Sequence, residues 1–164
     1  MDDEFDALIV GTNPAMILVT TASAGQRAGC LVGFHSQSSI QPRHFTFWLS
    51  TANHTTEIAR TATYFAVHFL LKQDRALAEL FGGHTADDDI DKFEHCEWTP
   101  GLDGVPVLTA CCERMIVEKL SMTETGGDHL CVVTRPIDVT SARTGARFHL
   151  SDATDIDAGH PPDE

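Results

Sequence analysis

The sequence predicts a mainly β domain, and three observations support this fold class. Six short apolar runs of strand length recur along the chain, each rich in β-branched or aromatic residues. Turn-forming residues lie beside them, as at 23–25 and 125–128. With 164 residues and 42% hydrophobic content, the chain suffices for one domain with its own core and is too short for two. The six runs are residues 15–20, 30–34, 45–49, 64–71, 115–120 and 130–134.

Two short helices are predicted between these runs. The first begins at Asn53 or Thr55 as its N-cap residue. The second takes Asp74 as its N-cap residue and ends at the glycine pair 82–83. Its apolar face consists of Leu77, Leu80 and Phe81. Residues 87–106 are predicted as a long irregular loop, of a length that is usually functional or mobile in a compact domain.

The overall charge excludes two classes of partner. The 24 acidic and 11 basic residues give a formal net charge of −13. A charge of this sign argues against binding to nucleic acid or to an anionic membrane surface. No apolar segment reaches the roughly 18 to 20 residues that a membrane span needs. We therefore expect a soluble protein that binds neither nucleic acid nor membrane.

The acids are unevenly distributed. Thirteen of them lie in three short segments without Lys or Arg, which are residues 2–6, 87–91 and 152–164. Acidic runs of this kind are usually solvated ends and loops. The sequence therefore predicts an acidic N-terminal segment (1–10), a folded domain (11–150) and an acidic, extended C-terminal tail (151–164). Residues 7–56 contain no acid, so an anionic ligand would meet little repulsion there.

The cysteines and the N-terminus indicate a cytoplasmic protein. Five cysteines, an odd number without a Cys-x-x-Cys pair or zinc-like spacing, favour reduced thiols over a disulfide framework. The N-terminus begins with acids and lacks the basic region and apolar core of a secretory signal. The nine histidines include no His-x-x-x-His pair, and no metal site is predicted. Fingerprints of Rossmann, P-loop and serine-hydrolase enzymes are likewise missing.

A first polar cluster follows the second apolar run. It consists of Gly33, Phe34, His35, Ser36, Gln37, Ser38 and Ser39. Small hydroxyls, an amide, an imidazole and bare backbone together suit hydrogen bonding to a flat heterocycle with polar edges. The alternative is an ordinary serine-rich connection between two strands, which composition alone favours.

A second polar cluster, residues 50–56, leaves a predicted strand and enters the first helix. A helix N-terminus presents unpaired N–H groups and a positive dipole end, so hydroxyls beside it can complete a phosphate cradle. The alternative is plain N-capping without a ligand. A third feature is the turn 126–128, after which His129 enters a strand. There its ring is placed to face a cleft, although a lone histidine in a hairpin is more often merely solvated.

Several segments, taken in order, resemble the flavin reductase family, which has the FMN-binding split-barrel fold. The resemblance covers roughly residues 11–139, and its specificity lies in the order and spacing of the segments. They are Pro14 and the segments 28–42, 53–55, 65–68, 78–83, 91–93, 104–108 and 127–129.

The resemblance implies a homodimer of six-stranded Greek-key split β-barrels with a few short helices, each holding FMN, with NADH or NADPH as co-substrate. By position, residues 33–39 would line the isoalloxazine ring and ribityl chain. The phosphate would lie against Ser50, Asn53, His54, Thr55 and Thr56. Lys92 and Phe93 would close the site, and His129, the candidate catalytic residue, would lie beside the nicotinamide.

The leading hypothesis is therefore an NAD(P)H-dependent FMN reductase that passes a hydride from reduced nicotinamide to the flavin. Such enzymes often supply reduced flavin to a monooxygenase partner. Two alternatives stay open. One is a non-enzymatic flavin-binding or carrier protein, and the other is an oxidoreductase that uses FAD or a deazaflavin on the same fold.

Overall fold

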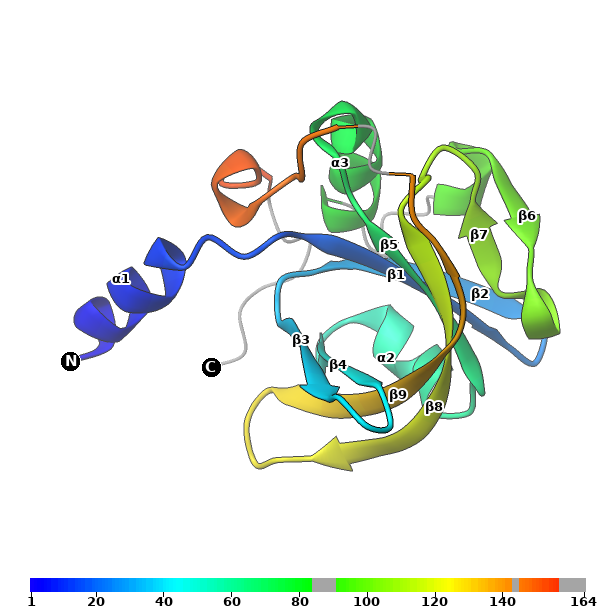
Figure 1. Ribbon diagram of the computed structural model, residues 1–164, viewed down its shortest axis with the longest axis horizontal. Coiled ribbons are helices and arrows are strands. Elements are labelled where there is room, and N and C mark those ends of the chain that lie inside the picture. Colours follow the sequence, from blue (N-terminus) through cyan, green and yellow to red (C-terminus); the bar gives the residue numbers. More distant parts are fainter. Residues whose placement is uncertain (84–90, 143–144, 157–164) are drawn as a thin grey trace.

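The computed structural model describes residues 1–83, 91–142 and 145–156. Seven strands form one antiparallel sheet in the order β2-β1-β5-β8-β9-β4-β3, and β6 pairs with β7 in a separate hairpin (Figure 1). The strands are β1 (Ile17–Ser23), β2 (Gln26–Val32), β3 (His35–Ser39), β4 (His44–Ser50), β5 (Tyr64–Phe69), β6 (Trp98–Pro100), β7 (Pro106–Leu108), β8 (Arg114–Glu124) and β9 (His129–Thr140). The helices are α1 (Asp2–Gly11), α2 (His54–Ala59) and α3 (Arg75–Gly83), with 3-10 turns η1 (Lys72–Asp74), η3 (Lys92–Glu94), η4 (Leu102–Gly104) and η5 (Leu150–Asp152).

The mainly β fold class is confirmed. Each of the six predicted apolar runs overlaps one strand of the large sheet, in order β1, β2, β4, β5, β8 and β9. The first polar cluster adds β3, which pairs with β4 at the edge of the sheet. Hydrophobic periodicity does not find this strand, because its side chains are polar and mostly exposed. A barrel of six strands and a homodimer stay predictions.

The first hydrophobic core lies inside the curl of the sheet. In each strand, alternate residues point to the same side, so a strand of five residues contributes two or three side chains. All strands of the large sheet except β3 contribute fully buried residues, and α2 closes one end with Ala59. The cluster consists of Ile17, Val19, Cys30, Val32, Phe47, Leu49, Ala59, Phe65, Val67, Val117 and Val132.

A second core covers the opposite face of β1. There Leu18 packs with residues of α3, the β6–β7 hairpin and the segment after β9. This cluster consists of Met16, Leu18, Leu70, Ala78, Phe81, Phe93, Leu108, Cys111, Phe148 and Ala153. The strand β1 is therefore buried on both faces, which explains why its sequence is a continuous apolar run rather than an alternating one.

Two segments predicted as irregular are ordered. The described part of the predicted loop 87–106 contains η3, β6 and η4, and β6 pairs with β7. The Trp98 indole N–H donates to the Phe93 carbonyl at 3.0 Å, and the Arg27 guanidinium lies 4.8 Å from the indole centroid. A hydrogen bond within the segment and the distant side chain of Arg27 thus both stabilise it. Asp87, Asp88 and Asp89 lie outside the described residues.

The described part of the C-terminal segment is not extended. It forms η5, and Ala153 packs into the second core. The Arg75 guanidinium donates to the Asp152 carbonyl at 2.7 Å and to both carboxylate oxygens of Asp155 at 2.7 and 2.8 Å. An acidic residue that the sequence assigns to a solvated tail therefore holds this segment against α3.

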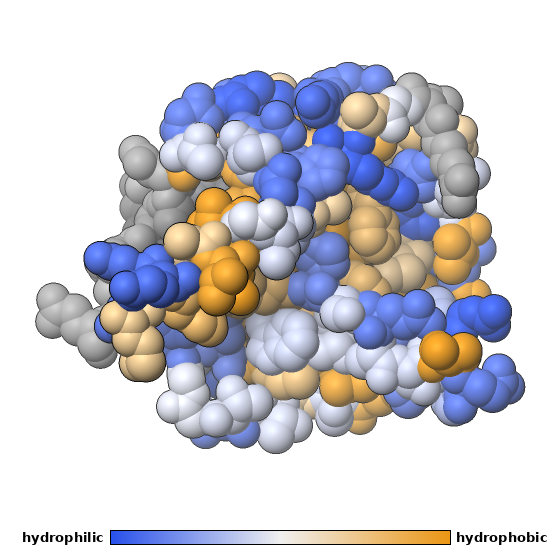
Figure 2. Space-filling model, turned by 60° about the vertical axis from the view of Figure 1, so that its left-hand side comes forward, coloured by the Kyte–Doolittle hydropathy of each residue, from blue (hydrophilic) through white to orange (hydrophobic). Residues whose placement is uncertain are grey.

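The acidic N-terminal segment forms helix α1, which extends away from the sheet (Figure 1). Its first turn carries Asp2, Asp3 and Glu4, where negative charge complements the helix dipole. No residue of this helix is buried, and Phe5 and Leu8 are exposed. Figure 2, which brings this side forward, shows hydrophobic residues beside hydrophilic ones on the surface.

The buried His68 joins three strands. Its ring lies between β1 and β7, where Nδ1 donates to the Leu18 carbonyl at 2.9 Å and Nε2 accepts from the Leu108 N–H at 3.0 Å. Because the backbone N–H can only donate, Nε2 carries no proton in this arrangement. Burial lowers the pKa of His68 to about 4, so the ring stays neutral at neutral pH.

We expect the stability of the protein to fall between pH 6.5 and 4 through His68. The unfolded chain protonates this histidine near 6.5, whereas the folded protein resists protonation until about pH 4. The unfolded state therefore binds more protons in this window, and as pH falls through it the free energy of unfolding decreases by about 3 kcal/mol.

Urea unfolding of wild type and His68→Gln at pH 7.5 and 5 measures this decrease. The pH dependence should be weaker in His68→Gln and unchanged in His95→Gln, which alters an exposed histidine. Equal slopes in all three proteins would contradict this role.

Candidate functional site

The three polar features of the sequence meet at one edge of the sheet. Antiparallel pairing of β4 with β9 sets Ser50 opposite His129. Just beyond the strands, the Thr51 N–H donates to the Asp128 carbonyl at 2.9 Å. The rings of Phe34 and His129 lie 4.9 Å apart between centroids, with an interplanar angle of 50°. Residues from the first cluster, the second cluster and the turn 126–128 are therefore neighbours.

The strand β3 gives this edge its polar character. It is the last strand of the sheet, so the outer side of its backbone has no partner strand among the described residues. Ser36, Gln37 and Ser38 are exposed, and the Thr46 hydroxyl donates to the Ser38 hydroxyl at 2.6 Å. Exposed backbone and hydroxyl groups beside the ring of Phe34, which is 53% exposed, form a surface with both polar and aromatic groups.

His35 differs from its neighbours in this cluster. Its Nε2 bonds to the Ala15 carbonyl, and its ring packs near Phe45 and Phe69 at centroid distances of 5.8 and 6.2 Å. The half-buried imidazole thus ties the start of β3 to the segment before β1. Gly33 has ordinary space around it, since a Cβ there would lie 3.5 Å from the Met16 sulfur.

The second cluster caps α2, and this confirms Asn53 as the N-cap residue. The Asn53 side-chain oxygen accepts from the Thr55 N–H at 2.9 Å, and the Asn53 backbone carbonyl accepts from the Thr56 N–H at 3.0 Å. Both threonine side chains are buried, and the Thr56 hydroxyl donates to the Ser50 carbonyl. The Thr55 and Thr56 side chains are thus part of the local fold of this helix start, and their role toward a phosphate stays a prediction. Asn53 is half-buried and His54 is exposed, so their side chains reach the surface.

Asp128 orients the imidazole of His129. Its carboxylate oxygen accepts from Nδ1 at 2.7 Å, and this hydrogen bond holds the pKa of Asp128 below its usual value. A carboxylate can only accept, so Nδ1 carries the proton and Nε2 faces away from Asp128 as an acceptor in the neutral ring. The His129 side chain is 30% exposed, so part of it is accessible at the surface.

Lys92 and Phe93 lie away from the edge of the sheet that carries the other candidate residues. Phe93 is buried in the second core, with its ring 5.4 Å from that of Phe81. The Lys92 ammonium donates to the Phe81 and Gly29 carbonyls at 3.1 and 3.4 Å. Gly29 and Cys30 are successive residues of β2, so they face opposite sides of the sheet. Cys30 faces the first core, together with Ala59 of α2, and Lys92 and Phe93 therefore lie on the other face of β2. Within one chain they do not join the other candidate residues.

One cation beside the site was not predicted. Arg147 stacks on Phe69, its guanidinium carbon 5.3 Å from the ring centroid, and its Nη2 lies 3.5 Å from a Glu113 oxygen. Its Nη1 atom is buried and has no hydrogen-bond partner among the described residues. Phe69 in turn contacts His35. No motif or periodicity marks this position, because it follows the last apolar run of the sequence.

The chain belongs to the flavin reductase family. Residues 11–152 match the family described as flavin reductase like domain, which covers most of the chain. In the residues that the structure describes, no group of three or more His, Cys, Asp or Glu side chains is placed to hold a metal ion. The described helices are also too short or too polar to cross a membrane.

Solved structures with the same fold include named flavoproteins. A flavin reductase domain protein from Arthrobacter sp. FB24 is 19% identical with a TM-score of 0.76, and the match covers 91% of this chain and 95% of that chain. The NADH:FAD oxidoreductase SgcE6 of Streptomyces globisporus, in complex with NAD and FAD fragments, is 18% identical with a TM-score of 0.76, covering 99% and 95%. An FMN-binding protein from Thermus thermophilus is 22% identical with a TM-score of 0.70, covering 77% and 70%.

The capping role of Asn53 gives a stability prediction. Asn53→Ala should lower the free energy of unfolding by about 1 kcal/mol, because the Thr55 N–H loses its acceptor. Asn53→Asp should stay within a few tenths of a kcal/mol of wild type, because its carboxylate accepts the same bond and complements the helix dipole. Urea unfolding at pH 7.5 checks both variants. An alanine variant as stable as wild type would show that the cap contributes nothing.

Proposed function

We propose that the protein is an NAD(P)H-dependent flavin reductase that transfers a hydride from NADH or NADPH to FMN. The observation that carries the proposal is the pairing of Phe34 with His129 beside the polar edge strand β3. This places an exposed aromatic ring, an oriented imidazole and a row of hydrogen-bonding groups on one surface. Membership of the flavin reductase family supports the same reading.

The residues present fit the ring portion of a flavin. An isoalloxazine has two flat faces and a polar pyrimidine edge, so it needs aromatic or apolar contact on a face and hydrogen bonds along the edge. Residues 33–39 supply both, since Phe34 is exposed and the outer backbone of β3 has no partner strand among the described residues. Donors along β3 would stabilise negative charge on the reduced ring.

The phosphate would lie near the start of α2. Here Ser50, Asn53 and His54 offer side chains at the surface, whereas Thr55 and Thr56 act through the local fold that positions them. The stretch 7–56 contributes no carboxylate here, and the nearby Asp128 has its carboxylate bonded to His129. Because Lys92 and Phe93 lie behind β2, their proposed role in closing the site depends on the second protomer of the proposed homodimer.

When bound, the flavin accepts the hydride and supplies the redox chemistry. The chain contributes position and surroundings. His129, held by Asp128, would offer Nε2 to a polar group of the nicotinamide, and Phe34 would offer an aromatic contact to the flavin. No side-chain nucleophile or base takes part, which is consistent with a sequence that lacks triads and metal clusters.

The finer assignments are part of the proposal. We place the protein in the cytoplasm, with a monooxygenase as the consumer of reduced flavin. A non-enzymatic flavin carrier, and an enzyme that uses FAD or a deazaflavin, are the alternatives. The use of FAD as the cofactor is supported by the fold that the chain shares with SgcE6, whose structure contains FAD fragments.

Anaerobic reduction tests the function. NADH or NADPH should bleach the visible absorbance of protein-bound FMN, and His129→Ala should slow this step about tenfold or more while FMN affinity stays within about twofold. His95→Asn is the matched control, since His95 is exposed and lies outside the site. If neither nucleotide reduces bound FMN, the reductase proposal fails and the carrier survives. If the protein takes up FAD or a deazaflavin but not FMN, the cofactor assignment changes.

Asn53→Asp separates phosphate binding from capping. The carboxylate preserves the cap but places a negative charge where the phosphate is proposed to lie. We expect FMN affinity to fall about tenfold or more and riboflavin affinity, without a phosphate, to change little. Fluorescence titration of both flavins measures the difference. Equal changes for FMN and riboflavin would show that this segment is a helix cap only.

A further inference from the structure

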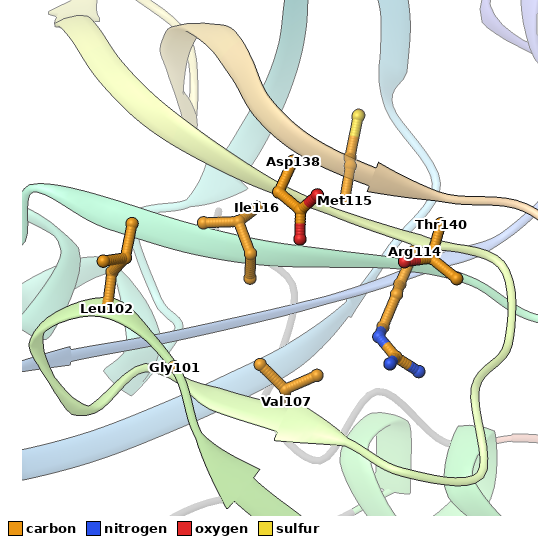
Figure 3. Close-up of a pocket in the computed structure, with 8 residues that line it drawn as sticks. All are labelled: Gly101, Leu102, Val107, Arg114, Met115, Ile116, Asp138 and Thr140. Atoms are coloured by element: carbon orange, nitrogen blue, oxygen red, sulfur yellow. The ribbon is translucent and has the colours of Figure 1, made fainter.

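A cavity of about 350 Å³ lies between the β6–β7 hairpin and the start of the β8–β9 pair (Figure 3). Its volume is within the range of small-molecule pockets. None of its lining residues belongs to the proposed flavin site. They are Gly101, Leu102, Val107, Arg114, Met115, Ile116, Asp138 and Thr140.

The charged groups of this cavity come from one face of two paired strands. The register sets Arg114 opposite Thr140 and Ile116 opposite Asp138, so Arg114 and Asp138 are diagonal neighbours. Diagonal neighbours on antiparallel strands are about 7 to 8 Å apart, close enough for long side chains to interact. An ion pair across the strands is the arrangement expected for these two residues.

The structure instead holds the two charges apart. The Arg114 guanidinium donates to the Cys111 carbonyl at 2.7 Å, which fixes it at one end of the cavity. Asp138 is exposed and has no hydrogen-bond or ion-pair partner among the described residues, and its carboxylate lies beside Ile116 at the cavity (Figure 3). The half-buried Arg114, with donors beyond its bond to Cys111, and the exposed carboxylate of Asp138, without a partner among the described residues, thus line the same space.

Apart from Thr140, the other side chains that line the cavity are apolar. Leu102 from η4 and Val107 from β7 face Ile116 from β8 across the cavity (Figure 3). These apolar side chains can contact a hydrocarbon group about the size of a ring, and they offer it no hydrogen bonds. Specificity must then come from the two charged groups and the Thr140 hydroxyl.

We propose that this cavity binds a small molecule with an apolar body, one carboxylate and, a few atoms away, a hydrogen-bond donor. The carboxylate binds Arg114, whose planar guanidinium suits bidentate pairing. The donor, a hydroxyl or an ammonium group, binds Asp138. The opposite orientation is disfavoured, because it would set the ligand carboxylate against Asp138 in a chain whose net charge is already −13.

Calorimetric titration of the full-length protein with saturating FMN tests the proposal. The probes are 4-hydroxybenzoate, which carries a hydroxyl donor, L-phenylalanine, which carries an ammonium, and benzoate, which carries neither. We expect 4-hydroxybenzoate or phenylalanine to bind saturably, and benzoate to bind about tenfold more weakly because Asp138 gains no donor. The better of the two probes identifies the kind of donor.

Variants assign the binding to the cavity. Asp138→Asn should weaken the donor-bearing probe about tenfold and leave benzoate nearly unchanged, and Arg114→Gln should weaken all probes about tenfold or more. Asp103→Asn is the matched control, since Asp103 is an acid on η4 outside the cavity lining, at φ 53°, which asparagine tolerates. Asp138 is exposed and has no partner among the described residues, so its variant should fold even if Arg114→Gln does not. The proposal is overturned if no probe saturates, if Asp138→Asn binds like wild type, or if a probe binds only when FMN is left out.

Discussion

The antiparallel register of β4 with β9 is the constraint on which the site depends. It sets Ser50 opposite His129, and the Thr134 hydroxyl reinforces it by donating to the Phe45 carbonyl at 2.7 Å. Side chains alternate along a strand, so a slip of one residue would turn His129 away from Phe34. The same slip would move buried Val132 out of the first core. Burial of the core therefore fixes the geometry of a surface that is itself polar and exposed.

The two-sided burial of β1 divides the molecule into regions with different chemistry. On one side, α2 and the curled sheet enclose the first core and present the Phe34–His129 pair at the rim. On the other side, α3, the hairpin and η5 build the second core. Lys92, Phe93 and the cavity with Arg114 belong with the hairpin. A ligand in that cavity and a flavin at the sheet edge would thus occupy separate surfaces of the domain.

The sequence predicts the strands that are buried and misses the elements that are not. The six apolar runs are visible because burial selects continuous or alternating hydrophobic residues. The strand β3 is polar, and β6 is held by the indole of Trp98 and the guanidinium of Arg27, contacts that no local pattern encodes. The meeting of Phe34 with His129 follows from strand pairing across a long stretch of chain, so single-sequence reasoning reaches it only through resemblance to a family. The commitment of the Thr55 and Thr56 side chains to the local fold depends on their burial, which composition does not reveal.

Asp128 shows why an acid can lie beside the proposed site for an anionic cofactor. The turn before β9 brings it next to a segment, 7–56, that contains no carboxylate of its own. Its hydrogen bond to His129 lowers the pKa of the carboxyl group, so the group stays ionised and continues to accept from Nδ1 over a wider pH range. The acid is therefore directed at the imidazole, and it determines which ring nitrogen a ligand at the proposed site would meet. An amide at position 128 would accept the same bond without the charge, so the orientation of His129 and the local electrostatics can be separated from each other by one substitution.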